Sequence, residues 1–513
     1  MILLIHPPVA KISEAPGGPA ALAGALRRHG VSYRIWDANL EGQLALFAAG
    51  AALGTGESDA WSRRAAKHLR ENLAALRSWE IYANGSRYRR AVTDLNRLLA
   101  LAGRPSGTRL SLKDCEADGL SPVSSANLMK SAALPEASPF YSWFSGRIEE
   151  LLADRTCSHV GFSLNYLSQA VTAFAMIGFI RRSHPAVRII LGGGLVTSWL
   201  RSPGWRNPLA DLVDEWVAGP GEVPLLTLLG KSPAGESSRP DLEGFPLGDY
   251  LAPGTVLPYS ASRGCWWRRC SFCPEQSEAS PYVPVPARRA AEELRLLVEE
   301  TRPVLVHLLD NALSPTHLDA LAAVPLGAPW YGFTRITPQL ASREFCAELK
   351  DAGCVMLKLG LESADQCVLD ALQKGIDLRI AATVLDNLEA VGIATYVYLL
   401  FGTPAETQRA ARRTMDFIAA HAGAIGFLNC AIFNLPAAGS EAETLDAEPF
   451  YEGDLSLYRS FVHPQGWDRG KVRRFLEREF KREPAIAEIL RREPPHFTSN
   501  HAPFVIMAGR PSL

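Results

Sequence analysis

Three cysteines lie within nine residues of one another, at Cys265, Cys270 and Cys273 in the segment SRGCWWRRCSFCPE. Residues 255–261 before them predict a strand, so the cysteines are expected on a loop at its carboxyl end. Thiolates at this spacing can converge on zinc or on an iron–sulfur cluster. A structural zinc site takes four ligands, yet no further histidine or cysteine occurs before His307. Because three cysteines on a four-iron cluster leave one iron open for a substrate or cofactor, the spacing favours a cluster.

Strand and helix patterns alternate after the cysteine loop, which indicates six strand–helix units. The expected strands are 255–261, 304–309, 330–335, 355–361, 394–401 and 425–433. Six parallel strands with outer helices form a partial barrel, and such barrels take catalytic residues from the carboxyl ends of their strands. Two charged residues lie at these ends. Arg335 could bind a carboxylate with both nitrogens or pair with a nearby acid, and Glu362 could simply favour a helix N-terminus.

The cysteine loop resembles the C-x3-C-x2-C signature of the radical S-adenosylmethionine (SAM) superfamily. Four residues separate Cys265 from Cys270, one more than in the usual signature, and the loop has the Cys-x-Phe-Cys ending of that family. The superfamily's partial barrel is similar to the six predicted units. The resemblance implies that the three cysteines hold a [4Fe–4S] cluster. It also implies SAM contacts from Phe272 at the adenine, Arg335 at the carboxylate, and Gly360, Glu362 and Ser363 near the ribose or amino group.

The first 230 residues predict a second parallel sheet. Five apolar runs with helical patterns between them are typical of a doubly wound sheet, which binds ligands beyond the carboxyl ends of its strands. The expected strands are 1–5, 31–36, 159–164, 188–191 and 212–217. No G-x-G-x-x-G follows the first strand, so a dinucleotide is not indicated. An Arg-, Ala- and Leu-rich stretch at 51–152 predicts a helical insertion, with a loop at 103–125.

A doubly wound domain directly before such a barrel resembles the cobalamin-binding branch of the superfamily, as do the segments HPP, DANLEG, GGGLVTS and VAGPGEVPL. The resemblance implies cobalamin contacts from the loop residues Pro7, Pro8, Ser163, Asn165, Gly192, Gly193, Gly194 and Glu222. The three glycines would permit close approach of a ligand or merely tighten a strand-to-helix connection. Trp266, beside the cluster, would wall the cavity, stack on the corrin ring or pack in the protein interior.

The composition excludes several classes of protein. With 513 residues, 47% of them hydrophobic and 21% charged, the chain is globular and long enough for two or three cores. Its 53 Lys and Arg residues nearly balance 54 Asp and Glu residues, which argues against binding nucleic acid or an anionic membrane. Apolar stretches fall short of the roughly 20 residues of a spanning helix. Nine cysteines, an odd number in a long chain, suggest reduced thiols and a cytoplasmic protein.

These observations predict a cobalamin-dependent radical SAM enzyme. The expected activity is methylation of an unactivated carbon in a natural-product precursor or peptide, with a flavodoxin- or ferredoxin-type electron donor as partner. A non-methylating cyclisation, rearrangement or oxidation is the first alternative, and a zinc-stabilised ligand-binding protein is the second. The expected organisation is a cobalamin-binding domain at 1–230, a linker at 231–250, a radical SAM barrel at 251–435 and a mainly helical capping region at 436–513.

Overall fold

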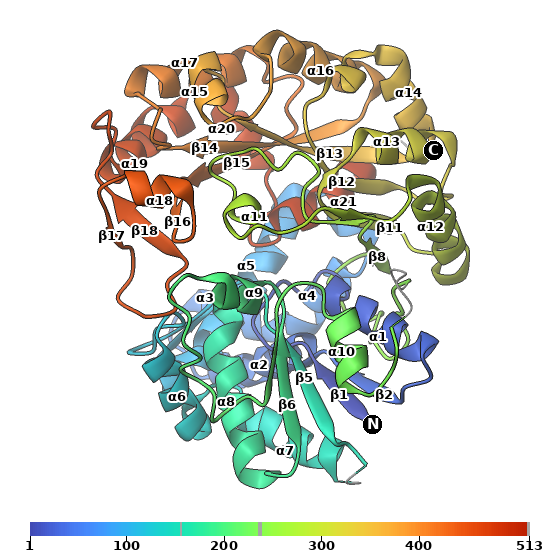
Figure 1. Cartoon of the computed structure of the whole chain (residues 1–513), viewed down its shortest axis with the longest axis vertical. Helices are drawn as coiled ribbons and strands as arrows, with labels where there is room; N and C mark the ends of the chain where they lie inside the picture. Colours follow the sequence, from blue (N-terminus) through green and yellow to red (C-terminus); the bar gives the residue numbers. More distant parts are fainter. Residues whose placement is uncertain (154–155, 234–238, 510–513) are drawn as a thin grey trace. The chain divides into compact units, whose positions relative to one another are not determined.

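The computed structural model describes residues 1–153, 156–233 and 239–509. Contacts within the chain divide it into two compact units, each with its own parallel sheet (Figure 1). The first unit comprises Met1–Gly254, Tyr451–Leu457 and Pro495–Phe497; the second comprises Thr255–Phe450, Tyr458–Pro494 and Thr498–Leu513. The predicted linker at 231–250 lies partly outside the described residues, at 234–238.

A five-stranded parallel sheet of order β2-β1-β5-β6-β7 forms the centre of the first unit. Its strands are β1 (Ile2–Ile5), β2 (Tyr33–Trp36), β5 (His159–Ser163), β6 (Arg188–Gly192) and β7 (Glu215–Val217). In register, Ile2 of β1 aligns with Tyr33 on one side and His159 on the other. The strand order reverses between β1 and β5, and doubly wound sheets bind ligands at that switch point. The predicted parallel sheet is confirmed.

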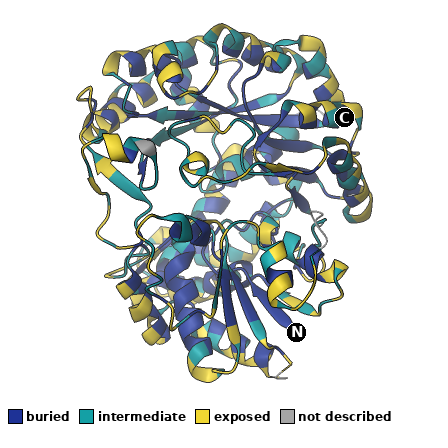
Figure 2. Cartoon of the chain, viewed as in Figure 1, coloured by how far each residue is buried: buried dark blue, intermediate teal, exposed yellow. Residues whose placement is uncertain are grey.

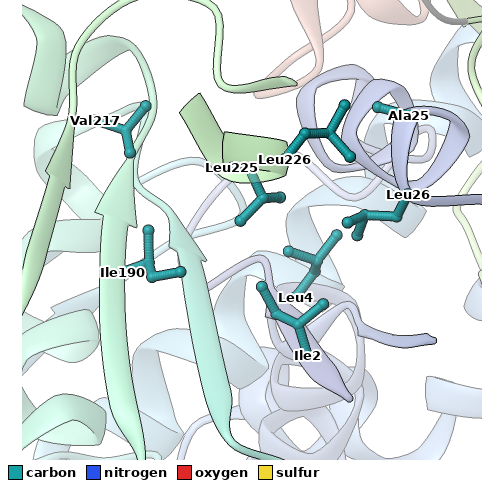
Figure 3. Close-up of a cluster of buried hydrophobic side chains, with 8 residues drawn as sticks. All are labelled: Ile2, Leu4, Ala25, Leu26, Ile190, Val217, Leu225 and Leu226. Atoms are coloured by element: carbon teal, nitrogen blue, oxygen red, sulfur yellow. The ribbon is translucent and has the colours of Figure 1, made fainter. Parts of the chain in front are cut away.

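Apolar side chains of the sheet and two helices form one of the cores of this unit. The helices are α1 (Gly17–Arg28) and α10 (Glu222–Leu228). Figure 3 shows the side chains turned toward one another: Ile2, Leu4, Ala25, Leu26, Ile190, Val217, Leu225 and Leu226. A third helix, α8 (Leu167–Ser183), is buried over most of its length because its middle is apolar on every side. This packing fixes the strand ends from which the candidate binding loops emerge.

The insertion is helical, as predicted, and it starts earlier than expected. Its helices are α2 (Ala38–Thr55), α3 (Ala60–Lys67), α4 (Leu69–Leu76), α5 (Gly85–Gly103), α6 (Ser125–Ala133) and α7 (Tyr141–Leu152). Asp37 of DANLEG caps α2 by accepting a hydrogen bond from the Leu40 amide at 3.0 Å. The expected loop at 103–125 contains an antiparallel hairpin, β3 (Thr108–Leu110) with β4 (Cys115–Ala117). Strands of three residues are too short to show a period in the sequence.

The second unit contains a six-stranded parallel sheet in which the strands follow chain order, β8-β11-β12-β13-β14-β15. They are β8 (Val256–Tyr259), β11 (Leu305–Leu313), β12 (Trp330–Thr334), β13 (Cys354–Glu362), β14 (Ala394–Phe401) and β15 (Phe427–Ile432). The helices between them are α12 (Ala287–Thr301), α13 (Pro315–Ala323), α14 (Arg343–Asp351), α15 (Gln366–Ala371), α16 (Leu378–Val391) and α17 (Gln408–Ala420). The strands are mostly buried (Figure 2). The predicted partial barrel is confirmed.

A buried lysine interrupts the apolar sequence of β13. The Nζ atom of Lys358 lies 2.9 Å from Nε2 of His307 on β11 and faces the rings of Tyr331 and Phe333. Hydrogen bonding and cation–π contact lower the cost of burying this cation.

The C-terminal region contains a small sheet in addition to its helices. It begins with an antiparallel sheet of order β16-β18-β17. The strands are β16 (Leu435–Pro436), β17 (Ala447–Pro449) and β18 (Tyr458–Phe461), and the helices are α18 (Ser440–Thr444), α19 (Arg469–Arg478), α20 (Pro484–Arg492) and α21 (Ala502–Ala508). Across the described residues, no helix combines the length and apolar character needed to cross a membrane.

Candidate active site

The three cysteines lie on the loop that follows β8, as predicted. Cys270 is buried, Cys265 and Cys273 are partly exposed, and all three are free thiols. Two short antiparallel strands bracket the loop, β9 (Ser262–Arg263) before it and β10 (Val283–Pro284) after it. After Cys273 the chain turns at once into α11 (Pro274–Ser277). The cysteines therefore belong to a closed loop with a fixed base.

Asp310 on the neighbouring strand β11 holds the start of this loop. Its buried carboxylate accepts hydrogen bonds from Ser262 Oγ at 2.6 Å and from the Ala261 amide at 3.0 Å. Burial raises the pKa of Asp310, and these two hydrogen bonds act in the opposite direction. Next to it, Asn311 donates to Glu275 of α11 at 2.8 Å. Both residues at the end of this strand therefore support the cysteine loop.

A turn after α15, residues 372–375, contacts the cysteine loop at every position. The carbonyls of Leu372 and Gln373 accept hydrogen bonds from the Ser271 amide at 3.1 Å and from Trp267 Nε1 at 3.0 Å. The Trp267 ring also occupies the space beside Gly375, where any side chain would collide with it. Lys374 contributes both its carbonyl and its ammonium group to the surroundings of the loop. Residues 372–375 are called the 372–375 turn below.

Charged groups surround Cys270. Arg335, at the end of β12, donates through Nη1 to the Cys270 sulfur at 3.6 Å and through Nη2 to the Lys374 carbonyl. Its guanidinium also lies 4.3 Å from the centre of the Trp267 ring. The Lys374 ammonium is 2.8 Å from the Glu362 carboxylate, and both side chains are almost fully buried. Two cations and one anion are therefore gathered beside one thiol.

Burial of the cysteines disfavours their thiolate form, and two nearby cations partly compensate at Cys270. Burial raises the pKa of Cys270, and the cations Lys374 and Arg335 lower it. Burial also raises the pKa of Cys273, to about 11, and the nearby Cys270 and Cys265 contribute to this rise. A bound metal would deprotonate these thiols and compensate their burial.

The donor set of the cysteine loop suits an iron–sulfur cluster, because cysteine thiolates are the usual ligands of such clusters. The three thiols on one loop, without a disulfide and beside two cations, therefore fit a cluster.

All five residues predicted to contact SAM lie on this loop or at the strand ends. The Phe272 ring packs against Val368, Leu372 and Ala410 and also against Phe433 and Leu435. A side chain at Gly360 would displace the Glu362 carboxylate and the Lys374 ammonium group, which occupy the space beside it. Glu362 has a left-handed backbone conformation, with φ at 68°. Arg335 contacts Cys270, as described above, and its binding to the SAM carboxylate stays a prediction, as do the other SAM contacts.

Ser363 and Trp266 have partners within the protein. Ser363 is fully buried, and its hydroxyl lies 3.3 Å from Thr414 Oγ1 on α17 and accepts from the Asp365 amide at 3.2 Å. Trp266 donates through Nε1 to the Leu313 carbonyl at 3.2 Å. These contacts give both residues a structural role.

Three strand ends meet at the carboxyl edge of the first sheet. Asn165, after β5, donates to Ser163 Oγ at 3.1 Å and accepts from the Gly194 amide at 2.9 Å, at the start of α9 (Gly194–Arg201). Gln169 donates to the Pro7 carbonyl at 2.7 Å and accepts from the Asn165 amide at 2.9 Å. These amide groups link the loops after β1, β5 and β6. The candidate residues Pro7, Ser163, Asn165 and Gly194 are therefore brought together.

The glycine run after β6 serves the connection between strand and helix. Gly193 has φ at 113°, and a side chain there would collide with the backbone of Leu164. Gly192 packs beside Val217 of β7, and Gly194 has more space. The glycine run was expected either to let a ligand approach closely or to tighten the connection from strand to helix. The tight connection accounts for Gly193.

The remaining candidates of this domain are Pro8 and Glu222. Pro8 is buried directly after Pro7, and His6 before them is buried as well, which lowers the pKa of its imidazole. Glu222 begins α10 after a loop in which Gly219 has φ at 74°.

Comparison with known proteins decides the nature of the second unit. Residues 259–418, which include the cysteine loop and most of the barrel, match the family described as the Radical SAM superfamily. These residues form a radical SAM domain. The predicted radical SAM enzyme is thereby confirmed, and with it the [4Fe–4S] cluster and SAM as the cofactors of this domain. No curated protein sequence matches the chain.

The fold of the whole chain is similar to that of a solved radical SAM methyltransferase, TsrM from Kitasatospora setae. The structure of TsrM with cobalamin and a [4Fe–4S] cluster matches 91% of this chain and 84% of its own length, with a TM-score of 0.53 and 16% identity. The structure with tryptophan and a SAM analogue matches 91% and 75%, with a TM-score of 0.52 and 15% identity.

The sequence identified the cysteines, Arg335 and Glu362 but missed Lys374 and the 372–375 turn. Lys374 and the 372–375 turn lie about a hundred residues beyond the cysteines, as their numbers show, and carry no metal-ligand pattern. A lysine followed by glycine at the end of a helical pattern was the only local signal, and it indicates a helix terminus rather than a site.

Proposed function

We propose that this radical SAM enzyme binds cobalamin and methylates an unactivated carbon of a natural-product precursor or peptide. The observation that carries the proposal is the presence, in one chain, of a doubly wound sheet and a radical SAM domain with an intact three-cysteine loop. The similarity of this arrangement to a methyltransferase solved with cobalamin supports it.

The radical SAM domain would hold the cluster on Cys265, Cys270 and Cys273. When bound, the cluster and SAM supply a 5′-deoxyadenosyl radical that can abstract hydrogen, and cobalamin supplies a methyl carrier. The protein's contribution is to position these groups and to exclude water. Glu362 would accept from a SAM hydroxyl or amino group.

The carboxyl edge of the first sheet would hold cobalamin. Its loops present backbone and amide groups from Pro7, Ser163, Asn165 and Gly194, which are suited to a large ligand with many amide side chains of its own. Pro8, Gly192, Gly193 and Glu222 complete the set of candidate contacts.

The test is anaerobic purification and reconstitution with iron, sulfide and cobalamin, followed by absorption spectra and a metal count. The proposal predicts about four irons per chain, as in a [4Fe–4S] centre, together with about one cobalt. Incubation with methyl-labelled SAM and candidate precursors should then yield labelled product and 5′-deoxyadenosine.

Three outcomes would overturn all or part of the proposal. Iron without cobalt would remove cobalamin from the function. The enzyme could bind both metals, form 5′-deoxyadenosine and consume a substrate without giving labelled product. That result would favour the non-methylating chemistry. Zinc without iron would remove the cluster itself.

A further inference from the structure

We infer that the charge of Lys374 raises the reduction potential of the cluster, and that the charge of Glu362 lowers it. The inference rests on the proposed function to the extent that the three cysteines must hold a [4Fe–4S] cluster. It concerns residues that bind no iron themselves. The argument depends on where the 372–375 turn places a buried ion pair.

The turn fixes the position of Lys374 relative to the cysteine loop. Residues on both sides of Lys374 contact the loop through main-chain carbonyls or close packing, as described above for Leu372, Gln373 and Gly375. The Lys374 carbonyl accepts from Arg335, which also donates to the Cys270 sulfur. Arg335 thus links the backbone of Lys374 to the proposed cluster ligand Cys270 by hydrogen bonds.

The ammonium group of Lys374 faces the same loop. It lies 5.5 Å from the centre of the ring of Phe272, the residue between Ser271 and Cys273, and 2.8 Å from Glu362 Oε1. The Lys374 side chain is 7% exposed and that of Glu362 is 12% exposed. Because water screens buried charges weakly, both groups act on the cluster at higher strength than surface charges would.

Reduction of the cluster by one electron adds one negative charge at the cysteine loop. A nearby cation stabilises the reduced form and raises the reduction potential, and a nearby anion does the opposite. Arg335 adds a second cation and an N–H donor to sulfur, which acts in the same direction as Lys374. The ion pair of Lys374 and Glu362 therefore contains two groups whose removal should shift the potential in opposite directions.

The experiment measures the midpoint potential of the reconstituted cluster by EPR-monitored titration, without SAM, in the full-length enzyme. In Lys374→Met the ratio of reduced to oxidised cluster at a fixed potential should fall about tenfold, which is about 59 mV toward negative values for a one-electron couple. Lys374→Arg keeps the charge and should restore most of the potential. Lys481→Met removes an exposed lysine that pairs with Glu477, and should leave the potential unchanged.

Glu362→Gln provides the decisive comparison. It removes the anion, leaves Lys374 uncompensated, and should move the potential toward positive values. A purely structural role for the ion pair would make both variants loosen the loop and shift the potential, or lose iron, in the same way.

The outcomes separate this inference from the proposed function. A wild-type enzyme without a four-iron signal contradicts the proposed function. A wild-type enzyme with the cluster, and equal or same-sign shifts in Lys374→Met and Glu362→Gln, contradicts the role of Lys374. If Lys374→Met fails to retain iron, the sign of the shift in Glu362→Gln still decides, because a negative or absent shift there overturns the inference.

Discussion

The carboxyl edges of the two parallel sheets are built from different chemical groups. At the first sheet, neutral amide groups of Asn165 and Gln169 join the loops through hydrogen bonds to backbone atoms. At the second sheet, the ionic groups of Arg335, Lys374 and Glu362 surround a thiol. Both edges follow the same topological rule for the position of a ligand site.

The difference shows how one topological rule serves two kinds of chemistry. Neutral donors and acceptors can hold a large polar ligand without changing its charge state. Buried cations stabilise anionic ligands and the extra electron of a reduced cluster, and their desolvation is tolerated only because each has a partner. Substitutions at the two edges should therefore have distinct consequences.

The largest effect is expected from loss of a cluster ligand. Cys270→Ala removes the thiolate beside Arg335, so iron content and formation of 5′-deoxyadenosine should both be abolished. Cobalt content, which depends on the other edge, should persist. The matched control is Cys367→Ala, which removes an exposed thiol on α15 and should keep iron. Equal iron in both variants would show that the cysteine loop does not hold the metal.

The next effect tests the backbone of the first edge. Gly193→Ala places a methyl group against the Leu164 backbone at a φ of 113°, which should cost about 4 kcal/mol in the free energy of unfolding. Urea unfolding measures this cost. Gly146→Ala, within α7 and with open space around it, is the control and should stabilise slightly. A tolerated alanine at Gly193 would mean that the tight turn does not constrain this edge.

The sequence predicted both sheets because each of the longer strands is an apolar run followed by a helix of clear period. It also predicted the cysteine loop, because ligands close in sequence are recognisable by spacing alone. The hairpin β3–β4 and the tail sheet were missed, since their short strands lie outside the alternation of strands and helices that marked the two parallel sheets.

The charged surroundings of Cys270 were predicted only in part, for a different reason. Arg335 and Glu362 stand at strand ends and were candidates from the sequence. Lys374 reaches Glu362 and Arg335 only through the packing of α15 and the turn that follows it, so these contacts depend on tertiary structure. The partner of Glu362 therefore could not be read from the chain.

A smaller effect is expected on the pH dependence of the free energy of unfolding, and it differs between the two units. Glu406, fully buried after β14, accepts from the Gly402 amide and from Trp467 Nε1 at 3.0 Å, and burial raises its pKa to about 7. The folded state holds this proton more tightly, so the stabilisation is complete below the usual pKa of 4.5 and is lost as pH rises to about 7. The loss should be about 3 kcal/mol, and Glu406→Gln should remove it.

His6 at the first edge provides the opposite case for the same experiment. Burial lowers its pKa, so its contribution is present above the usual value of 6.5 and is lost as pH falls below that value. When unfolding is followed from pH 4.5 to 8, Glu406→Gln and His6→Asn should therefore change the slope of stability against pH in opposite directions. Identical pH profiles for the two variants would contradict the assignment of one titrating group to each unit.

The smallest effect is expected at Asn165. Asn165→Ala removes the side-chain hydrogen bonds to Ser163 and Gly194 at a partly exposed site, which should lower the free energy of unfolding by about 1 kcal/mol. Asn165→Asp keeps the size and the acceptor for the Gly194 amide but loses the donor to Ser163, so it should fall between alanine and wild type in urea unfolding. Because the cysteine loop belongs to the other sheet, both variants should keep wild-type iron content while their cobalt content decreases. A parallel loss of iron would show that the two edges depend on one another, and the contrast between a neutral and an ionic edge would then no longer describe two independent sites.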